Sequence, residues 1–393
     1  MPWKVRDAMS LRAELVRLMQ QEGANVSELA RRFGVSRTTA YKWLGRFGQG
    51  GAQTLADRSR RPVRSPRRSS ANIAERVATL RREHPAWGGR KLRARLLALG
   101  EPLVPASSTI TGILRREGLL DPDASIKHTA FMRFEHAAAN DLWQMDFKGH
   151  FAMEQGRCHP LTVLDDHSRY SLGLQACGNE RTETVQERLT AMFRRYGLPW
   201  RMLMDNGSPW GDDGTHPYTP LTLWLLRMDI AISHGRPYHP QTQGKDERFH
   251  RTLKAEVLRQ ALRDLAHCQE RFDSWREVYN CERPHEALGM AVPASRYRAS
   301  QRPFPELLPP IEYGPGIQVR KVGDHGKIRY EGKPYRLPKA FKGYPVGLRA
   351  TDIDGVVDVL FGHHLVLHLD LRSGIATKPV HHVPAHLLAI SPV

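Results

Sequence analysis

The chain has 393 residues and a formal net charge of +18, a length that allows two or three domains with substantial cores. No apolar run is long enough to span a bilayer and no signal peptide is recognisable, so we expect a cytoplasmic, nucleoid-associated protein rather than a membrane-surface one. Four cysteines without a CxxC pair predict neither a disulfide framework nor a zinc cluster.

The positive charge is concentrated near the N-terminus. Residues 1–140 carry 26 Lys and Arg against 12 Asp and Glu, whereas the remainder carries 33 against 29. A basic excess of this kind attracts polyanions. The N-terminal third is therefore predicted to bind nucleic acid.

Residues 1–48 are predicted to form a helix-turn-helix DNA-binding domain. An amphipathic helix comes first, Ser27 is expected to cap a second helix, and Gly34-Val35 supplies the turn before a third helix that starts at Ser36. A purely structural three-helix bundle has the same pattern, but the turn and the charge favour DNA binding. The polar residues of the third helix that we expect to face the major groove are Arg37, Thr38, Thr39 and Lys42.

Residues 49–70 are predicted to be a linker. The segment mixes Pro and Ser with arginine and has too few apolar residues to pack a core. An extended Arg-rich peptide suits a narrow minor groove or the phosphate backbone. The alternative is a flexible spacer. The arginines in question are Arg58, Arg60, Arg61, Arg64, Arg67 and Arg68.

Residues 71–119 are predicted to hold a second helix-turn-helix domain, followed by a connector over 120–140. Its three helices are expected at about 73–80, 87–97 and 108–116, with Ser107 or Ser108 capping the third. Arg90 and Lys91 are its candidate DNA contacts. Two DNA-binding units joined by a basic linker would grip a longer site than either unit alone.

Two acids follow or interrupt apolar strands in the next part of the chain. Asp146 lies within an alternating strand at 142–147, and Asp205 follows a short apolar strand at 201–204. Ligands in open α/β sheets bind at the carboxyl ends of strands. A site for a metal ion at this edge of a sheet needs one more acid.

Glu247 is the candidate for that third acid. A helix is predicted from just after Gly244 to about Leu262. The simplest interpretation of its charged face is a solvated pair between Glu247 and Arg251. The upstream acids instead favour a carboxylate that holds a metal beside cations that hold phosphates. The apolar stripe comprises Phe249, Leu253 and Val257, and the charged face comprises Glu247, Arg251 and Lys254.

Four segments carry a resemblance to a known family. They are DLWQMDFKGHF (141–151), LMDNGSPW (203–210), HPQTQGKDERFHRTLK (239–254) and YNCERPHEALG (279–289). In this order they resemble the catalytic core of bacterial insertion-sequence transposases of the retroviral-integrase-like DDE class. The resemblance implies that Asp146, Asp205 and Glu247 form a catalytic triad binding two Mg²⁺ or Mn²⁺ ions, and that Arg251 and Lys254 touch the DNA end.

The resemblance also implies a function and partners. It implies a metal-dependent polynucleotidyl transferase that binds the terminal inverted repeats of its element, cleaves the DNA ends and joins them to target DNA. At least a homodimer is expected, because two ends must be joined together. Two alternatives are a catalytically silent DNA-binding regulator and a nuclease without joining activity. An ATPase partner is conceivable, but no segment indicates one.

The catalytic core is predicted over residues 141–300, with a ribonuclease-H-like α/β fold. Strands are expected at 142–147, 150–153, 160–164, 171–176, 201–204 and 230–233, and helices at 182–196, 218–228, 244–262 and 265–279. Between Asp205 and Glu247 lie 41 residues, more than is usual for the family, and Trp210–Pro217 is interpreted as an inserted loop. Its rival acids, Asp212 and Asp213, are expected to be solvated. Asp165 and Asp166 are expected to close a hairpin turn.

The C-terminal region changes pattern after a Pro-rich linker at 301–314. Short alternating segments with Gly and Asp-Gly turns predict a small all-β barrel over 315–375, followed by a tail at 376–393. It resembles the SH3-like barrel of integrases and phage Mu-type transposases. Its basic residues are interpreted either as DNA contacts or as a solvated face: Lys327, Arg329, Lys333, Arg336, Lys339 and Lys342.

Overall fold

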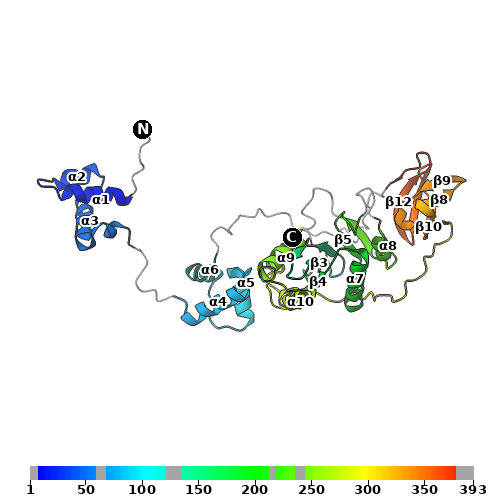
Figure 1. The fold of residues 1–393 in the computed structure, drawn as a ribbon, viewed down its shortest axis with the longest axis horizontal. Coiled ribbons are helices and arrows are strands. Elements are labelled where there is room, and N and C mark those ends of the chain that lie inside the picture. The colour runs from blue at the N-terminus through cyan, green and yellow to red at the C-terminus, as the bar shows by residue number, and fades with distance from the viewer. Residues whose placement is uncertain (1–7, 59–67, 121–134, 212–217, 235–243, 378–393) are drawn as a thin grey trace. The chain divides into compact units, whose positions relative to one another are not determined.

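The computed structural model describes residues 8–58, 68–120, 135–211, 218–234 and 244–377 (Figure 1). The chain divides into two structural units, residues 1–68 and residues 69–393. Within the described ranges, no helix combines the length and the apolarity that crossing a bilayer requires.

The N-terminal unit is a bundle of α1 (Ala8–Met19), α2 (Val26–Arg32) and α3 (Arg37–Gly50), followed by a short 3₁₀ helix (Gly51–Leu55). Asn25, not the predicted Ser27, caps α2, because its side chain accepts hydrogen bonds from the amides of Ser27 and Glu28. The predicted start of the linker is also too early. Leu55 is fully buried against Val16 and Trp43, so residues 49–55 belong to the bundle.

A second helical set begins the other unit, with α4 (Ala71–Glu83), α5 (Gly89–Ala98) and α6 (Ser107–Arg116). The N-cap of α6 is Ala106, which makes no side-chain capping bond, so the prediction of a serine cap is wrong. Ser107 is already the first helical residue, and its carbonyl accepts a hydrogen bond from the Thr111 hydroxyl. The core of this set includes the buried residues Trp87, Leu92, Leu96, Ile110 and Leu114.

A six-stranded mixed sheet forms the centre of the region predicted to be the catalytic core (Figure 1). Its strands run in the order β2 (Phe151–Ala152), β3 (Arg157–Asp165), β1 (Trp143–Phe147), β5 (Arg201–Met204) and β6 (Ala231–His234), and β4 (Ser171–Cys177) pairs with β3. β1 is antiparallel to β3 and parallel to β5, and β5 is parallel to β6. This is the order that places the ends of β1 and β5 side by side.

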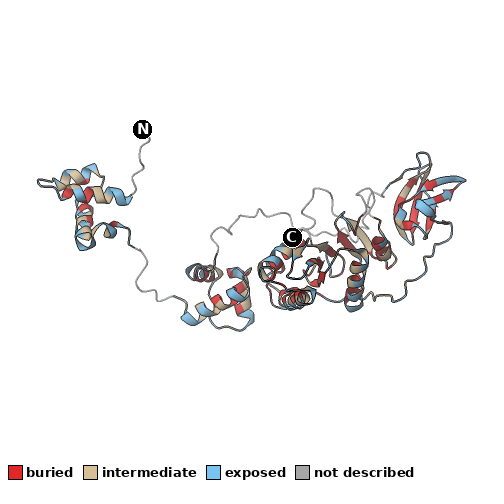
Figure 2. Ribbon diagram, in the orientation of Figure 1, coloured by how far each residue is buried: buried red, intermediate tan, exposed pale blue. Residues whose placement is uncertain are grey.

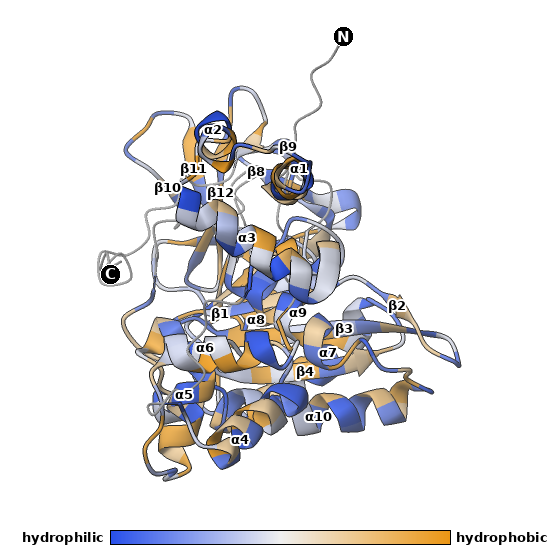
Figure 3. Cartoon of the chain, turned by 90° about the vertical axis from the view of Figure 1, so that its left-hand side faces the viewer, coloured by the Kyte–Doolittle hydropathy of each residue, from blue (hydrophilic) through white to orange (hydrophobic). Residues whose placement is uncertain are grey.

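Helices cover both faces of this sheet, and the alternation along each strand decides which face a side chain meets. α7 (Thr182–Tyr196) and α8 (Pro220–Leu226) pack on one face, and α9 (Gly244–Glu256) and α10 (Leu265–Cys281) pack on the other. Buried residues are concentrated between these layers (Figure 2). Along α10, hydrophilic and hydrophobic residues alternate, as a helix with one solvated side requires (Figure 3).

The two faces have separate apolar clusters. Trp143, Met145, Leu189, Phe193 and Leu225 are among those on the α7/α8 side. Leu164, Leu174, Phe249, Leu253 and Phe272 are among those on the α9/α10 side. The predicted apolar stripe of α9 is therefore confirmed, although the helix ends at Glu256 rather than near Leu262.

The C-terminal region is all-β, but a closed barrel is not confirmed. Five strands pair in the order β13 (Ala376–Thr377), β12 (His364–Asp370), β11 (Val356–Phe361), β10 (Pro345–Ala350) and β7 (Gln318–Lys321). β8 (Lys327–Tyr330) and β9 (Lys333–Arg336) form a separate hairpin. Among the described residues, no strand pairing closes the five-stranded sheet on itself. Tyr218, Leu223 and Leu226 share an apolar cluster with this β region.

Candidate active site

Asp146 lies on β1 with 22% of its side chain exposed. It is in register with Thr162 of β3, whose hydroxyl donates a 3.0 Å hydrogen bond to the Asp146 carbonyl. The same hydroxyl lies 3.0 Å from Nε2 of His250 in α9. Burial, and then the charge of Lys148, lower the pKa of His250 to about 4, so this imidazole is neutral at pH 7. Thr162 thus joins the strand that carries the acid to the helix that covers it.

Asp205 directly follows β5. Its Oδ1 accepts a 3.0 Å hydrogen bond from the amide of Gly207, and its carbonyl accepts a 2.7 Å bond from Nδ1 of His234. Burial raises the pKa of Asp205, although the Gly207 bond acts in the opposite direction. The carboxylate is therefore half-buried and fixed in direction.

Asp146 and Asp205 lie on adjacent parallel strands. The pairing matches Trp143 with Met202 and Gln144 with Leu203, and the same register continued by two residues brings the two acids side by side. The pKa of Asp146 is raised to about 7, first by burial and then by the negative charge of Asp205. Two half-buried carboxylates that repel each other are hard oxygen ligands, and a divalent cation relieves their repulsion.

Glu247 lies in the first turn of α9 and is exposed, as are Arg251 and Lys254. The three side chains share the outer face of the helix, as the helical spacing predicts. The apolar residues of α9 point the other way, into the cluster beneath the sheet. Glu247 is thus on the solvent-facing side of the helix that covers β1.

Asp246 is the acid that the sequence interpretation missed. It is fully buried, and its Oδ1 has no hydrogen-bond partner among the described residues. Burial, and then the charges of Asp146 and Asp166, raise its pKa well above the ordinary value. The signal was present in the sequence, because Asp246 falls on the same helical stripe as Phe249 and Leu253.

Asp165 and Asp166, the alternative acids at the end of β3, use their carboxylate oxygens in hydrogen bonds and an ion pair within the fold. Asp165 accepts hydrogen bonds from the amide of Ser168 at 2.7 Å and from the amide of Asn140 at 2.7 Å. Asp166 contacts the ammonium of Lys245 and accepts a 2.6 Å bond from the Gln144 side chain. Burial favours a higher pKa for Asp166, but Lys245, Arg169 and the hydrogen bond from the His136 amide together outweigh it and the pKa is lowered. The other rivals, Asp212 and Asp213, lie outside the described residues.

The predicted DNA contacts occupy several positions. Arg37, Thr38 and Lys42 are exposed on α3, and Thr39 is half-buried with its hydroxyl 2.9 Å from that of Ser36. Arg58 and Arg68 are exposed, whereas the other linker arginines lie outside the described residues: Arg60, Arg61, Arg64 and Arg67.

Arg90 and Lys91 differ from those residues in facing the catalytic region. Arg90 lies 3.6 Å from the carboxylate of Glu286. Lys91 is half-buried, and burial followed by the charge of Arg283 lowers its pKa to about 8. Arg90 is therefore paired with an acid of the same chain, and Lys91 lies near another cation.

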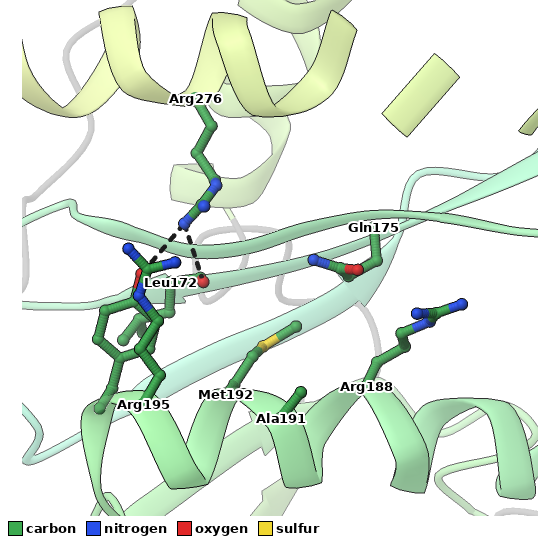
Figure 4. A pocket seen from close by; sticks show the side chains of 8 residues that line it. Leu172, Gln175, Arg188, Ala191, Met192, Arg195 and Arg276 are labelled. Atoms are coloured by element: carbon green, nitrogen blue, oxygen red, sulfur yellow. Dashed lines mark hydrogen bonds between the residues drawn. The ribbon is translucent and has the colours of Figure 1, made fainter. Parts of the chain in front are cut away.

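A small pocket lies between α7, β4 and α10 (Figure 4). Its lining includes the methionine side chain of Met192 and three arginines, Arg188, Arg195 and Arg276. Arg276 donates hydrogen bonds to the carbonyl of Leu172 at 3.2 Å and to the Tyr196 hydroxyl at 3.2 Å. No carboxylate lines the pocket, so it is separate from the acidic site.

Comparison with known families gives matches along most of the chain. Models described as "Integrase core domain" match residues 136–240 and 228–293. A helix-turn-helix domain matches 11–62 and a homeodomain-like domain matches 39–114. The model described as "IS481 family transposase, C-terminal domain" matches 317–377.

The curated relatives include proteins of bacterial insertion elements. The chain is 24% identical over 236 residues to the insertion element IS407 uncharacterized 31.7 kDa protein of Burkholderia multivorans, covering 58% of this chain and 82% of that protein. It is 43% identical over 118 residues to an uncharacterized protein of insertion element IS136 from Agrobacterium fabrum, covering 30% of this chain and 56% of that one.

Solved structures with some likeness are retroviral. One chain of a simian T-cell lymphotropic virus intasome, in complex with PP2A regulatory subunit B56 gamma, is 13% identical with a TM-score of 0.38 and covers 72% of this chain and 91% of that chain. The HTLV-2 integrase catalytic core domain in complex with magnesium (trimeric form) is 13% identical with a TM-score of 0.33, covering 42% and 100%.

The central sheet with its two apposed aspartates and the matched core models define a protein with an integrase-type catalytic core and N-terminal helix-turn-helix DNA-binding domains. The match of residues 317–377 to a transposase C-terminal domain and the relatives from insertion elements point to transposases within this class. In its core and its C-terminal region the chain is similar to bacterial insertion-sequence transposases.

Proposed function

We propose that this transposase binds the terminal inverted repeats of its own insertion sequence, cleaves the element's ends and transfers them into target DNA. The observation that carries the proposal is the pair Asp146 and Asp205 on adjacent strands, where the charge of one raises the pKa of the other. With Glu247 on the helix covering β1, these residues are the proposed catalytic triad.

The proposed metal ligands are the three carboxylates. The residues fit a hard divalent cation, because both aspartates offer oxygen atoms at a half-buried edge where burial raises the pKa of each carboxyl group. In such sites two bound Mg²⁺ or Mn²⁺ ions activate a water or a DNA 3′-hydroxyl and stabilise the leaving oxygen. Gly207 fixes the direction of the Asp205 carboxylate for this role.

The remaining polar residues are proposed to position DNA. Arg251 and Lys254 extend from the exposed face of α9 beside Glu247 and would hold phosphates of the DNA end. The exposed residues of α3, Arg37, Thr38 and Lys42, would read the repeat in the major groove. A water and a 3′-hydroxyl then use one site in turn, so cleavage and joining differ only in the nucleophile.

The C-terminal β region and the assembly complete the proposal. Its sheet and hairpin would form an SH3-like fold that contacts DNA through basic residues. The active form is proposed to be at least a homodimer on paired ends. No described segment points to an ATPase partner.

Two other functions compete with this one. A silent DNA-binding regulator would keep the helix-turn-helix domains without needing the apposed aspartates, so their retention favours catalysis. A nuclease would cut without joining. The DNA-binding domains that precede the core favour joining, because they would hold the cleaved end in place.

The decisive experiment is a joining assay with a labelled duplex from the element's end, target DNA and Mg²⁺. Asp146→Asn, Asp205→Asn and Glu247→Gln should each lower strand transfer by about 100-fold or more while binding to the duplex stays nearly unchanged. Glu187→Gln, a substitution of an exposed acid on α7, is the matched control and should join normally. Joining that persists in one of the three variants removes that residue from the triad, and cutting without joining by the wild type identifies a nuclease.

A further inference from the structure

We propose that Asp229, His363 and His364 form a second metal site, for Zn²⁺ or a similar transition metal, where the C-terminal β region packs on the core. Asp229 lies between α8 and β6, and the two histidines lie at the turn from β11 to β12. One ligand atom of each residue lies within 4.8 Å of the other two. This site is separate from the proposed catalytic acids and does not depend on the proposed function.

The distances between the ligand atoms suit a small, low-coordination ion. Asp229 Oδ1 lies 2.7 Å from His363 Nε2 and 3.5 Å from His364 Nε2. Ligands of a tetrahedral ion with bonds near 2.1 Å are about 3.4 Å apart. The observed spacing therefore needs only small side-chain adjustments to accept the ion.

One nitrogen of the His364 ring lacks a hydrogen-bond partner in the part of the chain that the structure describes. Its Nε2 is buried and has no hydrogen-bond partner among the described residues. The backbone of Leu226 lies within reach of the ring. A hydrogen bond from Nδ1 to that backbone would leave Nε2, which lies 3.5 Å from Asp229 Oδ1, facing the site. Histidines that bind metals commonly donate their other nitrogen to a backbone carbonyl, which leaves a lone pair directed at the ion.

Asp229 is also held in place. Its backbone has a φ of 58°, which aspartate tolerates better than most residues. Arg302 donates a 2.7 Å hydrogen bond to the Asp229 carbonyl, and its guanidinium lies 3.7 Å from Oδ2. Oδ1 then remains directed toward the histidines. A carboxylate ligand anchored through its second oxygen is typical of metal sites.

The two sides of the site are joined by direct packing. The Tyr218 hydroxyl donates a 2.6 Å hydrogen bond to the carbonyl of Val366 in β12. Leu223 and Leu226 of α8 share the apolar cluster of the β region. The three ligands therefore meet at a contact that exists without an ion, and a bound ion would cross-link the core to the β region.

The ligand types select the kind of metal. Two imidazoles and one carboxylate favour Zn²⁺, Co²⁺ or Ni²⁺ over Mg²⁺, which prefers oxygen ligands alone. The competing interpretation is an ion pair between Asp229 and a protonated His363, both of which are substantially exposed. That pair requires no metal, and the two interpretations give opposite results in a metal titration.

The test is a titration of the full-length Asp146→Asn/Asp205→Asn protein with Co²⁺, followed by visible absorption. This background removes the proposed catalytic aspartates and leaves the second site intact. We expect the intense bands of four-coordinate Co²⁺, saturating at one equivalent, and their loss on competition with Zn²⁺. Asp229→Asn and His363→Gln should each weaken binding by at least about tenfold.

Controls separate ligand loss from misfolding. Asparagine accepts the left-handed backbone of position 229, and His363 is exposed, so both variants should fold, as circular dichroism without metal will verify. His150→Gln, a substitution of an exposed histidine elsewhere, should bind Co²⁺ like its parent. Weak six-coordinate bands alone, or unchanged affinity in both ligand variants, would overturn the proposal and leave the ion pair.

Discussion

The indole Nε1 of Trp275 in α10 donates a 2.7 Å hydrogen bond to Oε2 of Glu256, the last residue of α9. The other carboxylate oxygen accepts a 3.3 Å bond from the amide of Ala86, which lies between α4 and α5. A second contact joins the same parts, because Val278 of α10 packs on the apolar cluster of the α4–α6 set. One carboxylate thus links the helix carrying Glu247, its neighbouring helix and the second helical set.

Glu256→Ala should therefore destabilise this junction. Removal of the carboxylate leaves a partly buried indole N–H and a backbone amide without partners, and we expect a loss of about 1–3 kcal/mol in the free energy of unfolding. Thermal unfolding measures the loss, and the emission of Trp275 should shift to longer wavelength as water reaches the ring. Glu270→Ala, a substitution of an exposed acid on the same α10 helix, is the control and should leave both readings unchanged.

The two adjacent acids at the start of α9 are expected to differ in their importance for strand transfer. Asp246 is fully buried whereas Glu247 is exposed, so we propose that Glu247, and not Asp246, holds a metal ion or DNA at the surface. Asp246→Asn preserves the shape of the side chain and should join DNA within about threefold of the wild type, whereas Glu247→Gln should lose about 100-fold or more. Strand-transfer rates under identical Mg²⁺ decide between them. Equal losses in both variants would mean that burial does not separate the two roles.

The sequence predicted the helices and strands of the catalytic core well, because clear local signals mark where each element ends. The helix at 182–196 ends at Gly197, whose φ of 76° terminates the helix, and the strand at 201–204 is a short apolar run that stops at Asp205. The expected ribonuclease-H-like arrangement of these segments around the strand of Asp146 follows from the family resemblance. The structure adds the register that brings the two aspartates together.

The missed features depend on contacts that local patterns do not encode. Asn25 and Ser27 are both good caps, and only the three-dimensional path of the chain shows that Asn25 reaches the free amides. Leu55 falls in the segment that is predicted to be a linker because of its Pro, Ser and Arg content, yet it completes a core with Val16 and Trp43. Alternating strands predicted an all-β region, but closure into a barrel depends on pairing between distant strands, which alternation does not specify.

The buried imidazole of His285 predicts a pH-dependent stability. Burial, and then the charges of Arg283 and Lys91, lower its pKa to about 2, and the Arg283 guanidinium lies 3.1 Å from its Nε2. An unfolded histidine has a pKa of about 6.5, so below that pH the unfolded state binds a proton that the folded state does not. Stability should therefore fall as the pH falls below about 6.5, by up to about 1.4 kcal/mol per pH unit from this residue.

His285→Gln tests this assignment. The variant should be less stable than the wild type at pH 7.5, because glutamine replaces the packed ring, but the difference should shrink by on the order of 1 kcal/mol at pH 5.5. Thermal unfolding at the two pH values provides the comparison. His150→Gln should follow the wild type at both, since the side chain is exposed. A His285→Gln curve that stays parallel to the wild type would show that another group causes the acid sensitivity.

Replacement of glycine by alanine should have opposite effects on stability at two positions, Gly89 in α5 and Gly112 in α6. A Cβ at Gly89 would lie 2.4 Å from the Thr111 hydroxyl and 2.6 Å from the Ser107 carbonyl, because α5 and α6 approach each other closely there. Gly89→Ala should cost about 1–3 kcal/mol of stability, since the two helices must separate. Gly112→Ala, within α6, meets only the end of the Arg116 side chain at 3.8 Å and should stabilise the helix by up to about 1 kcal/mol. Chemical denaturation measures both, and adding Thr111→Ala to Gly89→Ala should recover only part of the loss, because the backbone carbonyl of Ser107 remains in the way.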